Sequence, residues 1–142
     1  MRFADVNVLV YAHRPEAPRH DEWLEWLEAA RVDDEPLAVT DYVLAGFVRI
    51  TTHPRIFKDP TPPAVALDFV AAVRSAPSVV PVSPGERTWP IFEELIRSVD
   101  ARGNLVPDAL IAAMAIEQGA TLVTADRGFA RYPRLRWVTP VS

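Results

Sequence analysis

The stretch Phe3-Ala4-Asp5-Val6-Asn7 decides how the rest of the chain is interpreted. It belongs to a nearly continuous apolar run over residues 2–10, which is typical of a strand covered on both faces, as in a parallel sheet. Asp5 places a carboxylate inside that run. Because an unpaired buried carboxylate is costly, it normally pairs, takes up a proton or holds a metal ion. Asp5 is therefore either a structural residue at a strand end or part of a functional site.

The sequence leaves the end of this first strand open. The β-branched content of residues 2–10 favours a strand throughout. A strand that ends near Asp5 would instead allow Asn7 to cap a short helix over residues 8–12.

Strand and helix patterns alternate along the remainder of the chain. Strands are predicted at residues 37–39, 79–82, 121–124 and 136–139, and the proline in the second of them favours a sheet edge or a strand end. Helices are predicted at residues 19–31, 42–51, 63–75, 86–98 and 104–118. The alternation predicts an α/β fold with three layers, in which helices flank a mainly parallel central sheet. We expect one domain over residues 1–142.

Three of the predicted helices carry further expectations. Helix 104–118 is apolar all round and should be buried, with Pro107 at its first position and Gly119 ending it. Helix 63–75 is apolar on most sides, so it should pack on two surfaces, one of them on another subunit. In helix 86–98, Trp89 is expected to face inward, together with Phe92, Leu95 and Ile96.

Composition limits the classes to which the protein can belong. The chain has 142 residues, 49% of them hydrophobic and 24% charged, which is ordinary for one globular domain with a sizeable core. There is no cysteine, which excludes disulfides and thiolate–zinc sites and fits a reducing compartment. No apolar run reaches the ~18 residues of a membrane span, and no basic region precedes a signal core. These features predict a soluble, cytoplasmic protein.

The net charge of −4 argues against a protein that simply coats nucleic acid. Two basic clusters nevertheless stand out, one at residues 49–58 and one at residues 127–136. Fourteen of the fifteen basic residues are arginine, which binds phosphate bidentately. Genome composition explains the same bias equally well.

Two more acids stand in positions that match Asp5. Asp126 follows the predicted strand 121–124, and open α/β sheets bind ligands at the carboxyl ends of their strands. Asp108 lies in the first turn of the buried helix, where the helix dipole favours an anion. Taken singly, each is equally an ordinary turn or helix-start residue.

The three acids together predict a metal site. Carboxylates ~4 Å apart repel each other by about 4 kcal/mol at an effective dielectric of 20, and a divalent cation removes that repulsion. Hard oxygen ligands without cysteine or suitably spaced histidine point to Mg²⁺ or Mn²⁺. Such an ion serves phosphoryl chemistry by activating water and neutralising phosphate charge.

Three blocks of the sequence resemble one known family. They are Arg2-Phe3-Ala4-Asp5-Val6-Asn7-Val8-Leu9, Val106-Pro107-Asp108-Ala109-Leu110-Ile111-Ala112-Ala113 and Leu122-Val123-Thr124-Ala125-Asp126-Arg127-Gly128-Phe129. Their order and spacing are similar to those of PIN-domain ribonucleases, and of the VapC-type toxins of bacterial toxin–antitoxin pairs in particular. The resemblance implies a PIN-like fold and a homodimeric endoribonuclease that uses Mg²⁺ or Mn²⁺. It also implies an RNA substrate such as tRNA and an antitoxin encoded beside the toxin.

The resemblance also assigns roles to individual residues. Asp5, Asp108 and Asp126 match three of the four acids of the family, as catalytic residues and metal ligands. The fourth is usually a glutamate, and here Gly46 stands in its place, with Asp41 as the nearest acid. Either three acids and water suffice, which we favour because Mg²⁺ keeps several waters, or Asp41 reaches the metal, or activity is reduced.

Further residues have supporting roles in this interpretation. Asn7 and Thr124 are expected near the metal, although both also have ordinary capping roles. RNA phosphates are expected to contact Arg49, Arg127 and Arg131.

Three other functions compete with this one. A haloacid-dehalogenase-like phosphatase would need an Asp where Asn7 stands and a catalytic Lys, and Lys58 in the proline-rich loop is the only lysine. A response-regulator receiver meets the same lysine objection. A catalytically weakened PIN-like domain, which binds RNA or a protein partner without cleaving, stays open because of Gly46.

Overall fold

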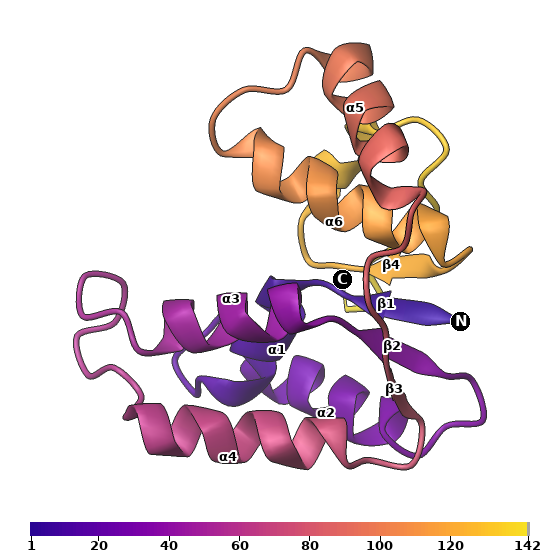
Figure 1. Ribbon diagram of the computed structural model, residues 1–142. Coiled ribbons are helices and arrows are strands. Elements are labelled where there is room, and N and C mark those ends of the chain that lie inside the picture. The colour runs from indigo at the N-terminus through magenta and orange to yellow at the C-terminus, as the bar shows by residue number, and fades with distance from the viewer. Residues whose placement is uncertain (142) are drawn as a thin grey trace.

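The computed structural model describes residues 1–141, and their strands form one parallel sheet. In spatial order the strands are β3-β2-β1-β4-β5, so β3 lies at an edge (Figure 1). Every neighbouring pair runs parallel. The strands are β1 (Arg2–Ala4), β2 (Leu37–Val39), β3 (Val79–Pro81), β4 (Thr121–Val123) and β5 (Trp137–Val138). The parallel sheet and the edge position of the proline-containing strand are both as predicted.

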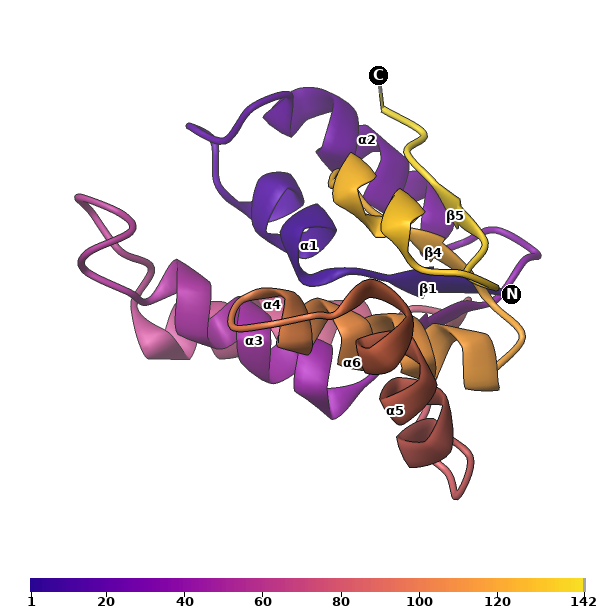
Figure 2. The same ribbon diagram turned by 90° about the horizontal axis from the view of Figure 1, so that it is seen from above.

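Helices cover both faces of this sheet. The view in Figure 2 shows α1 and α2 on one side and α3 to α6 on the other, which confirms the three-layer α/β fold. The helices are α1 (Val6–His13), α2 (His20–Ala30), α3 (Asp41–Thr51), α4 (Pro63–Arg74), α5 (Thr88–Val99) and α6 (Leu105–Glu117), with a short 3₁₀ helix, η1 (Arg127–Arg131). Within residues 1–141, no helix combines the length and the hydropathy that crossing a bilayer requires.

Of the two ends that the sequence left open for the first strand, the one near Asp5 is confirmed and a strand throughout residues 2–10 is wrong, because β1 ends at Ala4. The Asp5 side chain accepts a hydrogen bond of 2.7 Å from the backbone N–H of Val6 and so caps α1. The helix therefore begins at Val6, and Asn7 lies inside it instead of capping it. The cap and the burial of the apolar side chains in α1 outweigh the strand preference of its valines.

The buried helix α6 matches its prediction, apart from its first turn. Six of its residues between Ala109 and Ala115 are buried, and Gly119 ends it with a φ of +63°. Pro107 is the third helical residue, not the first. The position still suits proline, because the N–H groups of the first turn have no partner within the helix.

The expectation for Trp89 in α5 is wrong, whereas the second packing surface expected of α4 stays a prediction. Trp89 does not face inward: its side chain is 62% exposed, because the buried stripe of α5 runs through Thr88, Ile91 and Leu95. Helix α4 fully buries Ala66 and Val73 and stacks Phe69 on Phe47 of α3, whereas Val65 and Leu67 on it remain exposed within this chain.

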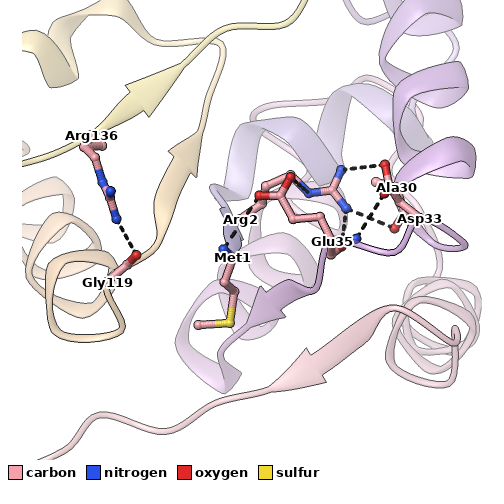
Figure 3. Close-up of polar contacts among 7 residues, drawn as sticks. All are labelled: Met1, Arg2, Ala30, Asp33, Glu35, Gly119 and Arg136. Carbon is pink, nitrogen blue, oxygen red and sulfur yellow. Dashed lines mark hydrogen bonds and ion pairs between the residues drawn. The ribbon is translucent and has the colours of Figure 1, made fainter.

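Arginine side chains bind the segments next to the amino ends of the strands. These ends lie opposite the carboxyl ends of the strands, where Asp5 follows β1. The guanidinium of Arg2 donates to the backbone carbonyl of Glu35 over 2.6 Å and lies 3.9 Å from the carboxylate of Asp33 (Figure 3). Arg136 in turn donates to the carbonyl of Gly119. The charged contacts at the amino ends of the strands are therefore structural, whereas Asp5 and Asp126 lie at the carboxyl ends.

Candidate active site

The carboxyl ends of the two central strands bring Asp5 and the segment after β4 together. Ala4 pairs with Val123 in the parallel register, and the backbone N–H of Asp5 donates to the carbonyl of Val123 over 3.0 Å. Asp5 is only 4% exposed. Two segments more than a hundred residues apart in sequence thus meet at one point, as the strand-end positions predict.

Thr124 connects the groups at this point. Its hydroxyl donates to the second carboxylate oxygen of Asp5 over 2.7 Å and accepts from the backbone N–H of Asp126 over 3.0 Å. The Asn7 side-chain amide lies 3.4 Å from the same hydroxyl, and its oxygen accepts from the N–H of Ala125 over 3.2 Å. Thr124 and Asn7 therefore hold the acidic segment in place next to Asp5.

Asp108 approaches the same place from α6. Asp5, Asp108 and Asp126 all line one pocket of about 850 Å³. Asp126 also caps η1, since its side chain accepts from the N–H of Gly128 over 2.8 Å. The structure thus brings the three predicted acids to one cavity.

The pKa values of these acids reflect burial and mutual repulsion. Burial, with a smaller contribution from the charges of Asp108 and Asp126, raises the pKa of Asp5 to about 6, against the hydrogen bonds from Thr124 and Val6 that lower it. The pKa of Asp108 is also raised, by burial and by Asp126, while Arg131 opposes that rise. The carboxylates are therefore close enough to disfavour each other's charge, which is a situation that a cation relieves.

The donor set fits a hard divalent cation by its chemistry, although it is not a closed cage. In residues 1–141 no three His, Cys, Asp or Glu side chains stand close enough to one another to form a ready metal site. Mg²⁺ typically keeps several waters and takes only one or two protein carboxylates directly. Carboxylates spread around a pocket that is large enough to admit water suit this mode of binding better than full coordination by protein ligands.

Gly46 lies in the wall of the pocket, and Asp41 does not. Asp41 is exposed in the first turn of α3. A Cβ atom at position 46 would lie 3.1 Å from a methyl carbon of Val6, so the packing of α1 on α3 leaves little room for a side chain there. The position expected to carry a fourth acid thus lines the pocket without a side chain.

The three arginines expected to contact phosphate occupy different places. Arg49 lines the pocket, and Arg131 in η1 is near enough to Asp108 to lower its pKa. Arg127 is exposed and is not part of the pocket wall.

Sequence reasoning missed the apolar part of this pocket. Its wall includes Tyr11 from α1, Tyr42 from α3, and Ile56 and Phe57 from the α3–α4 loop. The proline-rich composition predicts a loop at residues 53–63 but not its course, so no signal in the sequence pointed to these side chains.

The sheet order and the shared acid pocket define a PIN-like protein, and the comparison with family models agrees. The PIN domain model matches residues 2–135. The chain therefore belongs to the PIN-domain family.

Within that family the chain groups with the VapC ribonucleases. It is 49% identical to Ribonuclease VapC43 of Mycobacterium tuberculosis, over 100% of this chain and 97% of that protein. It is 41% identical to Ribonuclease VapC25 of the same species, over 99% of both chains.

Solved structures share the fold at lower identity. The crystal structure of VapBC2 from Rickettsia felis bound to a promoter DNA fragment matches with a TM-score of 0.71 and 23% identity, over 96% of both chains. VapC20 of M. tuberculosis, described as a sarcin–ricin loop cleaving toxin, matches with a TM-score of 0.67 and 16% identity, over 96% of this chain and 99% of that one.

Proposed function

We propose that this protein is a metal-dependent endoribonuclease that hydrolyses RNA phosphodiester bonds and acts as the toxin of a type II toxin–antitoxin pair. The observation that carries the proposal is that Asp5, Asp108 and Asp126 line one pocket at the carboxyl edge of the sheet. Membership of the PIN-domain family and the full-length likeness to proteins named ribonucleases support it.

The proposed cofactor is Mg²⁺ or Mn²⁺, held by Asp5, Asp108 and Asp126. When bound, such an ion activates water and neutralises charge on the phosphate that is attacked. Asp5 is oriented for this task by Thr124 and by the N–H of Val6, because both of its carboxylate oxygens accept a hydrogen bond. Asp126 is oriented by Gly128 in the same way.

The basic residues are proposed to bind the substrate. Arg49 lies in the pocket wall and can contact a phosphate next to the acids. Arg131 lies close to Asp108, and Arg127 follows Asp126 directly, so both can hold flanking phosphates. The carboxylates repel RNA, so tight substrate binding should also require the metal.

The proposed partners are an RNA substrate, tRNA among the structured RNAs, a cognate antitoxin and a second copy of the chain in the cytoplasm. The R. felis relative was crystallised as a VapBC complex, which supports an antitoxin. Val65 and Leu67 on α4 are 47% and 57% exposed, which supports a homodimer contact there.

A second candidate is a domain that binds RNA or protein without cleaving. Gly46 in place of the fourth acid and the absence of a ready three-residue metal cluster in residues 1–141 favour it.

The two candidates differ in one assay, cleavage of total RNA by the purified protein with Mg²⁺ or with EDTA. We expect cleavage with Mg²⁺, none with EDTA, and at least about a hundredfold loss in Asp5→Asn and in Asp108→Asn, because each removes a charge on which the metal depends. Asp34→Asn in the exposed loop between α2 and β2 is the matched control and should behave as wild type. Full activity in either site variant, with the fold intact, would reject the assignment, and no cleavage by wild type would favour the binding domain.

A further inference from the structure

The pocket has a second half that the acids do not occupy. Tyr11 lies six residues beyond Asp5 in sequence, which is about 9 Å along the axis of α1. Tyr11, Ile56 and Phe57 line this half, and Arg49 lines the same pocket. An apolar, aromatic surface therefore continues directly from the acidic end.

The guanidinium group of Arg14 packs on the Phe57 ring and holds it in place. The guanidinium carbon of Arg14 lies 4.3 Å from the centre of the Phe57 ring. Arg14 also donates to the hydroxyl of Thr61 over 2.9 Å and to the carbonyl of Asp59 over 2.7 Å. These contacts tie the α3–α4 loop to the end of α1.

Hydrogen bonds within the loop fix it further. The N–H groups of Ile56 and Phe57 both donate to the carbonyl of His53 over 3.1 Å, and the N–H of Thr61 donates to the carbonyl of Thr51 over 2.8 Å. Ile56 is nevertheless 51% exposed. The loop thus presents apolar side chains in a set position at the pocket, and an exposed apolar surface of this kind indicates an interaction site.

The chemistry of this surface suits a nucleobase. Unpaired RNA bases are bound by stacking on aromatic rings, and stacking tolerates any base because each has a π face. The surface is continuous with the carboxylates, which must lie next to the scissile phosphate, and Arg49 supplies a cation for the sugar–phosphate backbone. Its separation from Asp5 places a base from a neighbouring nucleotide within reach.

We infer that Tyr11 and Phe57 form a subsite that stacks an unpaired base of the RNA substrate beside the cleavage point. The inference rests on the proposed function, since it names where that function's substrate is gripped. The subsite makes the enzyme select single-stranded or unstacked positions in RNA and leaves base identity weakly specified.

The test measures binding without cleavage. Wild type and variants are titrated in EDTA, where binding is weaker than with the metal but no cleavage occurs, at protein concentrations high enough to saturate the RNA. The probe is a short single-stranded RNA that carries one 2-aminopurine, whose fluorescence is quenched when the base stacks. We expect quenching by wild type, and binding weaker by about 5- to 150-fold in Phe57→Ala and in Tyr11→Leu, which is the effect of losing one stacked base. Phe57→Tyr and Tyr11→Phe keep a ring and should bind as wild type.

Controls separate stacking from folding and from catalysis. Val32→Ala removes an exposed apolar side chain from the loop after α2, outside the pocket, and should change nothing. Circular dichroism checks the fold, and the Tyr11 pair carries the test if Phe57→Ala unfolds the loop. With Mg²⁺ the loss should appear as a higher KM for RNA, with kcat within a few-fold of wild type.

The outcomes for the subsite and for the proposed function differ. Unchanged RNA binding and KM in both Phe57→Ala and Tyr11→Leu would overturn the subsite and leave the nuclease in place. Ring-dependent quenching by a protein that never cleaves RNA would keep the subsite and reject the nuclease.

Discussion

At the scale of single residues, Asp5 serves the fold and the site at once. One of its carboxylate oxygens caps α1 through Val6, and the other accepts from Thr124 inside the pocket wall. The sequence left a structural and a functional role for Asp5 open, and the geometry is compatible with both. A capping carboxylate that is also buried beside two other acids is under electrostatic stress in the metal-free protein.

That stress predicts a dependence of stability on pH in EDTA. The pKa of Asp5 is raised from an ordinary value near 4 to about 6, so the folded state binds its proton more tightly than the unfolded state. The free energy of unfolding should therefore fall as pH rises from about 4 to about 6, by up to about 3 kcal/mol from this group. Urea denaturation at a series of pH values measures it.

The matched variant for this prediction is Asp5→Asn, which cannot titrate. The difference in unfolding free energy between wild type and Asp5→Asn should change across this pH range and stay constant above it. A difference that is independent of pH would show that Asp5 has an ordinary pKa.

An acidic side chain in place of Gly46 is predicted to raise the affinity of the pocket for a divalent metal ion. Gly46→Glu would place a fourth carboxylate at the pocket wall, but its Cβ presses on Val6, so we expect the full gain only with Val6→Ala. The double variant should bind Mn²⁺ at least about tenfold more tightly, because a tenfold change needs only about 1.4 kcal/mol and unit charges ~4 Å apart gain about 4 kcal/mol at an effective dielectric of 20.

Calorimetric titration with Mn²⁺ compares these proteins. Val6→Ala with Gly46→Gln has nearly the same shape without the charge and should bind as wild type. Equal affinity in the Glu and Gln forms would mean that position 46 does not face the ion.

At the scale of helices and strands, the sequence predicted what periodicity controls and left open what a single cap controls. The strand at residues 37–39 and the buried helix follow from apolar runs of distinct length. The end of β1 depended instead on one hydrogen bond from the N–H of Val6 to Asp5, which the strand propensity of residues 2–10 does not report, although Asp is a favoured capping residue. The prediction that Trp89 faces inward is wrong because Trp89 lies next to the buried stripe of α5. Periodicity does not determine whether a residue beside such a stripe is buried.

Glu117 of α6 holds the start of α5 through hydrogen bonds. Its carboxylate accepts from the N–H of Gly85 over 2.7 Å, the N–H of Arg87 over 2.9 Å and the hydroxyl of Thr88 over 2.6 Å, at the start of α5. Glu117→Ala should lower the free energy of unfolding by about 1–3 kcal/mol, because these donors lose a charged acceptor.

Denaturant unfolding of Glu117→Ala beside Glu93→Ala gives the comparison. Glu93 contributes only an exposed ion pair with Arg97 at 3.5 Å, so its loss should cost less than about 1 kcal/mol. If both variants lose the same stability, Glu117 does not anchor α5.

At the scale of the whole molecule, the amino ends and the carboxyl ends of the parallel strands have different roles. Arg2 and Arg136 fasten the amino edge, and the carboxyl edge gathers the three acids. The meeting of the acids could be predicted because parallel strands end at a common edge. The apolar half of the pocket could not, since the position of Phe57 depends on Arg14, Asp59 and Thr61 meeting across a loop.

The central claim is that Asp5, Asp108 and Asp126 share one hard cation. Anomalous diffraction from crystals grown with Mn²⁺ tests it most directly, with crystals of Asp108→Asn as the matched control. We expect an Mn²⁺ peak in the pocket among the three carboxylates, weakened or lost in the variant. A pocket without Mn²⁺, or a peak bound to acids elsewhere, would contradict it.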